Sequence, residues 1–120
     1  MKLFVDDIRR YPDDWILART VSEAIRILDT LSVEEISLDH DIACYHLDGS
    51  QHSSNETFEP VARFIVRLPK EQQPKIVYIH TANPYGADIL YNILKSTDIK
   101  IIRDWTFGEG LRNEKSDNQI

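Results

Sequence analysis

The chain has 120 residues, the length of one domain, and 42% of them are hydrophobic, too many for a disordered chain. Its net charge of −6, with no run of Lys or Arg, excludes duplex DNA or RNA as a major partner, because phosphate neutralisation needs a basic face. The lone Cys44 excludes an intrachain disulfide. No apolar stretch approaches the roughly 18 residues of a membrane span, and the first apolar run ends too early for a signal peptide. We expect a soluble, cytoplasmic protein without a membrane partner.

The first two predicted strands lie close together in the sequence. Residues 2–5 form the first, and a second short apolar run at 15–18 follows a polar segment. Only about nine residues join them, whereas a parallel crossover usually needs about a dozen or more. The helix between them is therefore missing or vestigial, or the second run is barely a strand.

The first clear helix begins after Thr20, a predicted N-cap with Glu23 three residues on. Its apolar residues recur at helical spacing as far as Leu31, and a third strand is predicted at 35–38. Residues 39–55 are mostly polar, which predicts a long loop that is functional or mobile.

A second helix follows this loop, with Pro60 in its first turn, and a fourth strand is predicted at 75–79. Asn83 is the predicted N-cap of a third helix, with Pro84 as the first helical residue. A fifth strand is predicted at 99–102, with no convincing helix after it. This alternation predicts an α/β domain with a mostly parallel sheet. Its expected bounds are 1–108, followed by a polar tail at 109–120.

Polar clusters follow three of these strands. They are Asp6 and Asp7 after the first strand, Asp39, His40 and Asp41 after the third, and His80 and Thr81 after the fourth. With the strand order 2-1-3-4-5 these strands are neighbours, and their carboxyl ends form the edge where open sheets bind ligands. Crowding like charges is unfavourable unless a cation offsets them. Carboxylates suit Mg²⁺ or Mn²⁺, and imidazoles add affinity for Mn²⁺ or act as general acid and base.

Each of these residues also has a structural interpretation. An Asp at a strand end commonly caps a turn or a helix, and a single histidine more often packs than catalyses. The joint pattern of carboxylates and imidazoles favours a functional site at this edge.

Candidate anion-binding groups lie beside the acidic cluster. The helix that starts at 83–86 points its first N–H groups outward, and Gly86 allows close approach of a ligand to the backbone; the alternative is an ordinary helix start. Arg9, Arg10 and Arg103 follow strand ends, where they either bind phosphate or balance the acidic residues.

Four stretches of the chain together resemble one family. They are residues 3–9, residue 15 with 18–20, residues 36–41 and residues 79–86. Over about residues 2 to 103 the chain resembles the cyclic-phosphate processing receiver-like domains, relatives of two-component receiver domains. The Leu38-Asp39-His40-Asp41 run is the most specific element. The resemblance implies a receiver-like (flavodoxin-like) fold: an open, mostly parallel five-stranded sheet in the order 2-1-3-4-5, with the first and last helices reduced or missing.

The resemblance also implies a metal site and residue roles. Asp6 and Asp7 match the acidic pair of the first strand, Asp39 matches the position that ordinary receivers phosphorylate, and Thr81 matches their hydroxyl residue. The cyclic-phosphate branch adds His40, Asp41 and His80. The lysine that receivers carry at the end of the fifth strand is absent, and Arg103 stands near its place.

The leading hypothesis is a hydrolase of the phosphodiesterase type that opens a cyclic phosphate, such as a cyclic nucleotide, with a bound Mg²⁺ or Mn²⁺. The predicted metal ligands are Asp6, Asp7, Asp39 and Asp41; the predicted catalytic residues are Asp39, His40 and His80; the predicted phosphate-binding residues are Thr81, Asn83, Gly86, Arg9 and Arg103. One histidine would deprotonate a water and the other would protonate the leaving alkoxide. The alternatives are a cyclic-nucleotide binding module without catalysis and a stand-alone receiver phosphorylated on Asp39. The sequence leaves the substrate, the metal and the oligomeric state open.

Overall fold

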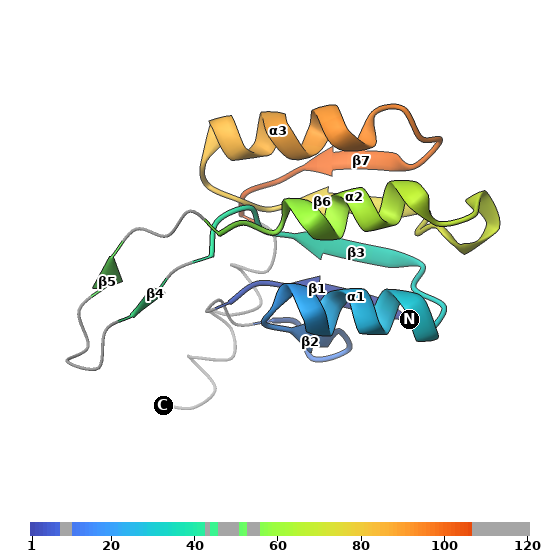
Figure 1. Ribbon diagram of the computed structural model, residues 1–120, viewed down its shortest axis with the longest axis horizontal. Coiled ribbons are helices and arrows are strands. Elements are labelled where there is room, and N and C mark those ends of the chain that lie inside the picture. Colours follow the sequence, from blue (N-terminus) through green and yellow to red (C-terminus); the bar gives the residue numbers. More distant parts are fainter. Residues whose placement is uncertain (8–10, 43, 46–50, 53–55, 107–120) are drawn as a thin grey trace.

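Five parallel strands form one open sheet in the computed structural model, which describes residues 1–7, 11–42, 44–45, 51–52 and 56–106 (Figure 1). The strands are β1 (Lys2–Val5), β2 (Ile16–Ala18), β3 (Glu35–Leu38), β6 (Ile76–Ile79) and β7 (Lys100–Arg103). Their spatial order is β2-β1-β3-β6-β7, and every neighbouring pair is parallel. Counted along this sheet, the order is 2-1-3-4-5, so the predicted flavodoxin-like topology is confirmed.

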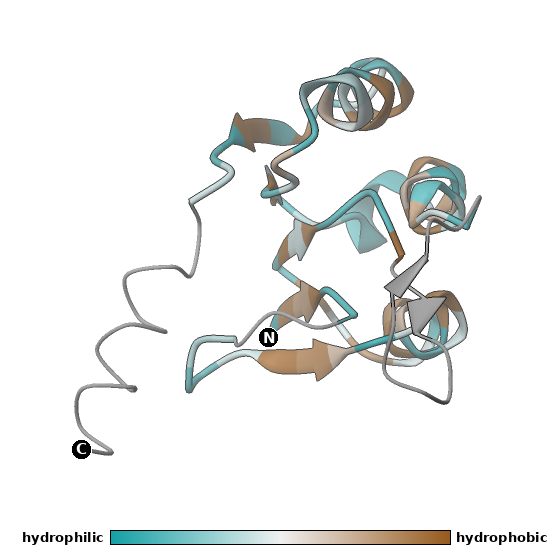
Figure 2. Ribbon diagram, turned by 90° about the vertical axis from the view of Figure 1, so that its left-hand side faces the viewer, coloured by the Kyte–Doolittle hydropathy of each residue, from teal (hydrophilic) through white to brown (hydrophobic). Residues whose placement is uncertain are grey.

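The three α-helices of the described residues lie on one face of this sheet (Figure 2). They are α1 (Val21–Thr30), α2 (Glu59–Arg67) and α3 (Pro84–Leu94), and a short 3₁₀ turn, η1 (Lys70–Gln72), follows α2. Parallel sheets usually carry helices on both faces. Here no helix covers the second face within the part of the chain that the structure describes, because the connection from β1 to β2 is too short for one. The first helix of the topology is absent from those residues, as the sequence predicted.

The strands present different residues to the two faces, because successive side chains of a strand alternate. On the helix side, Leu3 and Val5 of β1 are fully buried and belong to the apolar core with residues of all three helices. On the helix-free side, Phe4 is also fully buried and meets Trp15 edge to face, with ring centroids 6.4 Å apart. Trp15 in turn meets Tyr78 of β6 at 6.1 Å. The helix-free side of the sheet therefore has its own aromatic cluster.

The predicted helix starts are confirmed by their hydrogen bonds. The hydroxyl of Thr20 accepts a bond of 3.1 Å from the backbone N–H of Glu23 at the start of α1. The Asn83 side chain accepts a bond of 3.1 Å from the N–H of Tyr85, and Pro84 is the first residue of α3. Both caps satisfy backbone donors that a helix start leaves unpaired.

Two local predictions differ from the structure. The segment 39–55 is not a loop throughout, because β4 (Cys44–Tyr45) and β5 (Gln51–His52) form a short antiparallel pair. Leu31, expected on the apolar stripe of the first helix, is 47% exposed, because α1 ends at Thr30 and Leu31 is its extended C-cap.

Two further predictions concern the C-terminal tail and membrane spans. The predicted tail at 109–120 lies outside the described residues. Among the helices that the structure describes, none combines the length and apolar character that a membrane span requires.

Candidate metal centre at the carboxyl edge of the sheet

Three strands end at the same level, and each is followed by one residue that continues the ladder. Val5, Leu38 and Ile79 are aligned partners in β1, β3 and β6. Beyond them, the N–H of Asp39 donates to the carbonyl of Val5 at 3.0 Å, and the N–H of His80 donates to that of Leu38 at 2.9 Å. The backbone thus holds the first residue after each strand side by side.

The side chains of Asp6, Asp39 and His80 converge at this edge. Each offers one ligand atom, and these atoms all lie within 4.8 Å of one another. Asp6 and His80 are buried, and Asp39 is half-buried. Two carboxylates and an imidazole at these separations are a donor set that a divalent ion can bind. The three side chains therefore form a candidate metal centre, with Asp39 as its most exposed member.

Both ring nitrogens of His80 have hydrogen-bond partners within the protein. Its Nδ1 lies 2.7 Å from the Ser37 hydroxyl, and its Nε2 lies 2.9 Å from Oδ2 of Asp6. The ring stacks on Phe4 with centroids 4.6 Å apart and planes 9° from parallel. No part of His80 is exposed to solvent. The ring is thus fixed in orientation, on the helix-free side of the sheet together with Phe4.

The carboxyl group of Asp39 is poorly suited to carry a charge in the metal-free protein. Burial and the neighbouring charge of Asp6 raise its pKa to about 7, against the opposing hydrogen bonds from the His40 backbone and the Thr81 side chain. Asp7 adds a smaller repulsion in the same direction. A cation placed between these carboxylates would remove this repulsion.

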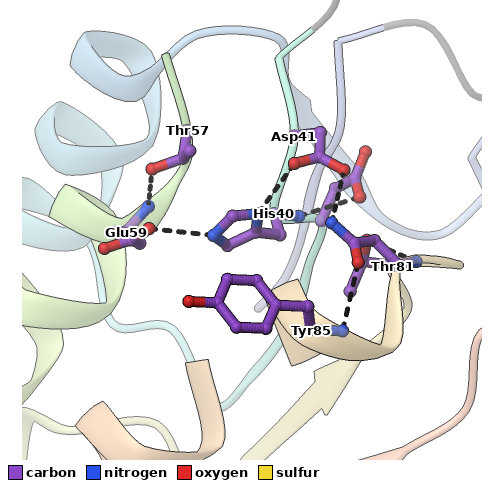
Figure 3. Close-up of polar contacts among 8 residues, drawn as sticks. His40, Asp41, Thr57, Glu59, Thr81 and Tyr85 are labelled. Atoms are coloured by element: carbon purple, nitrogen blue, oxygen red, sulfur yellow. Dashed lines mark hydrogen bonds and ion pairs between the residues drawn. The ribbon is translucent and has the colours of Figure 1, made fainter. Parts of the chain in front are cut away.

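The second imidazole, His40, lies in a separate network on the helix side (Figure 3). Its Nδ1 is 2.8 Å from Oδ1 of Asp41, and its Nε2 is 2.9 Å from Oε2 of Glu59 in the first turn of α2. Asn83 donates to the other oxygen of Asp41 at 3.3 Å. His40 is buried, whereas the Asp41 side chain is 58% exposed. Asp41 thus lies with His40 and Asn83 and is not one of the three residues that converge at the metal centre.

The chain around Asp41 explains why this residue departs from the alternation of the strand. Asp41 and Thr57 form an antiparallel bridge, and the N–H of Phe58 donates to the His40 carbonyl at 2.8 Å. The chain after β3 therefore pairs with the chain that enters α2. Asp39 and Asp41 would share a side only in a continuing strand.

The start of α3, predicted to bind an anion, is engaged in contacts within the protein. A Cβ atom on Gly86 would come within 2.6 Å of Cγ and Nδ1 of His40, so the ring fills the space that this glycine leaves open. The Asn83 side chain caps the helix and bonds Asp41. A ligand that approached Gly86 closely would have to displace His40.

The predicted cationic residues have different surroundings. The Arg103 guanidinium forms an ion pair with Asp88 of α3 at 2.8 Å. Arg9 and Arg10 lie outside the described residues. Arg19 belongs to a stretch that carries the family resemblance but was not among the predicted phosphate-binding residues, and its guanidinium donates to the backbone carbonyl of Asp6 at 3.4 Å. Phosphate binding by Arg9 and Arg103 stays a prediction.

Sequence reasoning missed two residues that contact the histidines. Ser37 is a polar residue in the middle of the otherwise apolar buried strand β3, and that signal alone marks it for attention. Glu59 has no local signal, because its contact with His40 depends on how α2 meets the end of β3.

The fold and this centre define a receiver-like α/β domain with a candidate metal site where its strands end. The family model described as the cyclic-phosphate processing receiver domain matches residues 1–96. The chain belongs to that family, as its motifs predicted, and this membership links it to the processing of cyclic phosphates. No curated protein and no solved structure gives a significant match to the chain.

Proposed function

We propose that this domain hydrolyses a cyclic phosphodiester with the help of a divalent metal ion. The observation that carries the proposal is the convergence of Asp6, Asp39 and His80 at the carboxyl edge of the sheet, in a member of a cyclic-phosphate processing family. Open α/β sheets bind their ligands at this edge.

The residues fit a metal ion by their chemistry. Burial and, after it, the charge of neighbouring Asp6 raise the pKa of the Asp39 carboxyl group, and a cation would relieve the repulsion between the two carboxylates. Asp7, half-buried beside them, adds negative charge. The ion would polarise the phosphoryl group and lower the pKa of the attacking water.

The chain's own polar groups have distinct tasks in this proposal. The Thr81 hydroxyl, which donates its hydrogen to Asp39, would turn that hydrogen to a phosphate oxygen once a cation neutralises the carboxylate. Asp41 is the exposed end of the His40 network. Its carboxylate therefore accepts a proton from the attacking water and then donates that proton to the leaving alkoxide. His40, held between Asp41 and Glu59, orients Asp41 and stabilises its charge. Enclosed His80 does not suit proton exchange with substrate.

The test is a substrate panel measured with Mn²⁺, with Mg²⁺ and with EDTA. The panel contains 2′,3′- and 3′,5′-cyclic nucleotides, cyclic oligonucleotides and ADP-ribose cyclic phosphate. We expect at least one ring to be opened with the metal and none with EDTA. Asp39→Asn should reduce kcat at least a hundredfold, and Asp41→Asn at least tenfold. If no member of the panel is opened with either metal, the proposed hydrolysis is wrong.

One observation favours binding without turnover as a second function. All four ring nitrogens of His40 and His80 already have partners within the protein, so neither imidazole offers a proton acceptor to a substrate. Equilibrium dialysis with the same panel separates the two functions. Release of intact cyclic nucleotide from a tight complex after denaturation supports the binding module, and slow conversion of the bound ligand supports the enzyme.

The phospho-receiver alternative has its own support, because partly exposed Asp39 is bonded to Thr81, at the two positions that receivers use. Labelling of the protein by a small phosphodonor, lost in Asp39→Asn, would favour this alternative. Absence of labelling would exclude it.

A further inference from the structure

We propose that His80 is a nitrogen ligand of the metal centre, with Ser37 as the residue that fixes its ring, and that the centre therefore selects Mn²⁺-type transition ions over Mg²⁺. This inference rests on the metal site of the proposed function but not on hydrolysis. The sequence left two roles open for the imidazoles, proton transfer and added affinity for Mn²⁺, and this inference assigns His80 the second.

The packing of His80 restricts it to this task. The ring is fully buried, stacked on Phe4 at 4.6 Å, and bonded at both nitrogens. Turning it toward a substrate would break the stack and both hydrogen bonds. In its present orientation, Nε2 points at Asp6, and Asp6, Asp39 and His80 each have a ligand atom within 4.8 Å of the others.

The hydrogen bonds determine where the ring proton lies before an ion binds. The Asp6 carboxylate only accepts, so Nε2 carries a hydrogen that it donates to Asp6. In the neutral ring, Nδ1 is then an acceptor, and the Ser37 hydroxyl donates to it across 2.7 Å.

Binding of an ion at Nε2 would require the other neutral tautomer of the ring. Nε2 would release its proton to solvent so that its lone pair is free for the ion, and Nδ1 would take up one proton from solvent, which leaves the charge of the ring unchanged. The new Nδ1–H then donates to the Ser37 oxygen, which is the usual support for a metal-bound histidine. A hydroxyl serves both states because it donates and accepts. Ser37 is thus a positioning residue that holds one ring orientation in two tautomers.

The donor set gives the selectivity. Mg²⁺ prefers oxygen ligands, whereas imidazole nitrogen suits transition ions. With one imidazole and two carboxylates, we expect the centre to bind Mn²⁺ at least tenfold more tightly than Mg²⁺. Ser37→Ala should weaken Mn²⁺ binding by about ten- to a hundredfold, the usual effect of losing such a support.

The experiment uses the wild-type chain, so that it does not depend on a variant that fails to fold. Electron spin-echo envelope modulation of the Mn²⁺-loaded protein should show coupling to an imidazole ¹⁴N. In protein labelled selectively with ¹⁵N histidine, a ¹⁵N coupling should replace this ¹⁴N coupling. Nuclear magnetic resonance of the side chains should show His80 with hydrogen on Nε2 in the metal-free protein. With Zn²⁺, a diamagnetic probe, hydrogen should be on Nδ1.

His40→Asn is the matched control, because the His40 ring is bonded to Asp41 and Glu59, and only the backbone N–H of His40, which the variant keeps, donates to Asp39. The nitrogen coupling should persist in this variant and disappear in His80→Asn. A Mn²⁺ spectrum without imidazole coupling, or a Zn²⁺ complex that keeps hydrogen on Nε2, would overturn the inference. Hydrolysis by a protein whose metal has only oxygen ligands would contradict this inference but support the proposed function. Nitrogen ligation without hydrolysis of any substrate would support this inference but contradict the proposed function.

Discussion

The two histidines at this edge make hydrogen bonds of nearly equal length but lie in different surroundings. His80 is on the helix-free side, with buried Asp6 and Ser37 as partners. His40 is on the helix side, and its partners Asp41 and Glu59 are 58% and 26% exposed. From this comparison we expect the burial of the partner, more than the length of the hydrogen bond, to determine how much the bond contributes to the free energy of unfolding. A buried partner that loses its bond cannot turn to water.

The largest expected effect is therefore the contrast between His80→Ala and His40→Ala in metal-free protein. His80→Ala leaves buried Asp6 and Ser37 without this partner and removes the stack on Phe4, so it should lower the free energy of unfolding by about 3–5 kcal/mol. His40→Ala should cost about 1–2 kcal/mol, because Asp41 reaches water. Urea denaturation in EDTA measures both. Equal losses of unfolding free energy in the two variants would contradict the expected dependence on the burial of the partner.

The second effect concerns the pH dependence of metal-free stability. The folded pKa of Asp39 is raised from 3.8 to about 7, so its contribution is fully present below about pH 4 and is lost as the pH rises through 7. Between these values, the free energy of unfolding should fall by up to about 1.4 kcal/mol per pH unit from this group. Asp39→Asn should flatten this decline and stabilise metal-free protein at pH 8 by about 1–3 kcal/mol.

Denaturant midpoints from pH 5 to pH 8 measure this decline. Saturating Mn²⁺ is the internal control, because a cation stabilises the ionised carboxyl group and should also flatten the curve. A metal-free wild-type protein that becomes more stable toward pH 8, relative to Asp39→Asn, would contradict the raised pKa.

The third effect sharpens the description of the His40 side. Gly86→Ala places a methyl group within 2.6 Å of the His40 ring, so it should cost about 1–2 kcal/mol by overpacking. In a His40→Ala background the same change should instead stabilise by up to about 1 kcal/mol, because alanine is the better helix former. A double-mutant cycle by urea denaturation measures the difference. An identical cost in both backgrounds would show that His40 does not fill this space.

The smallest effect tests the burial argument at an exposed contact. Arg103 and Asp88 pair at 2.8 Å, as short as the bonds of His40, but their side chains are 43% and 61% exposed. Asp88→Ala should change the free energy of unfolding by less than about 1 kcal/mol, and the change should shrink at high salt. Thermal unfolding at low and high ionic strength measures it. A loss as large as that of His40→Ala would show that bond length outweighs burial here.

The fold was predictable because its signals are local. The apolar runs at 2–5 and 35–38 predicted the bounds of β1 and β3. The N-cap residues Thr20 and Asn83 predicted where α1 and α3 begin. The short connection before β2 predicted either a reduced or missing first helix or a second strand that is barely formed, and the described residues of this connection contain no helix. The β4–β5 pair was not predictable, because neither two-residue strand has a detectable periodicity.

The sequence by itself predicted that Asp6, Asp7, Asp39, Asp41, His40 and His80 would gather at one edge, because all of them follow strands of one parallel sheet. Only the tertiary structure selected Asp6, rather than Asp7, as the carboxylate that converges with Asp39 and His80. Only the tertiary structure decided that Asp41 turns to His40 instead, because the chain after β3 pairs with Thr57 rather than continuing the strand. Side-chain alternation holds only while a strand continues. Beyond its end, the direction of each side chain is determined by chain segments that arrive from elsewhere in the fold.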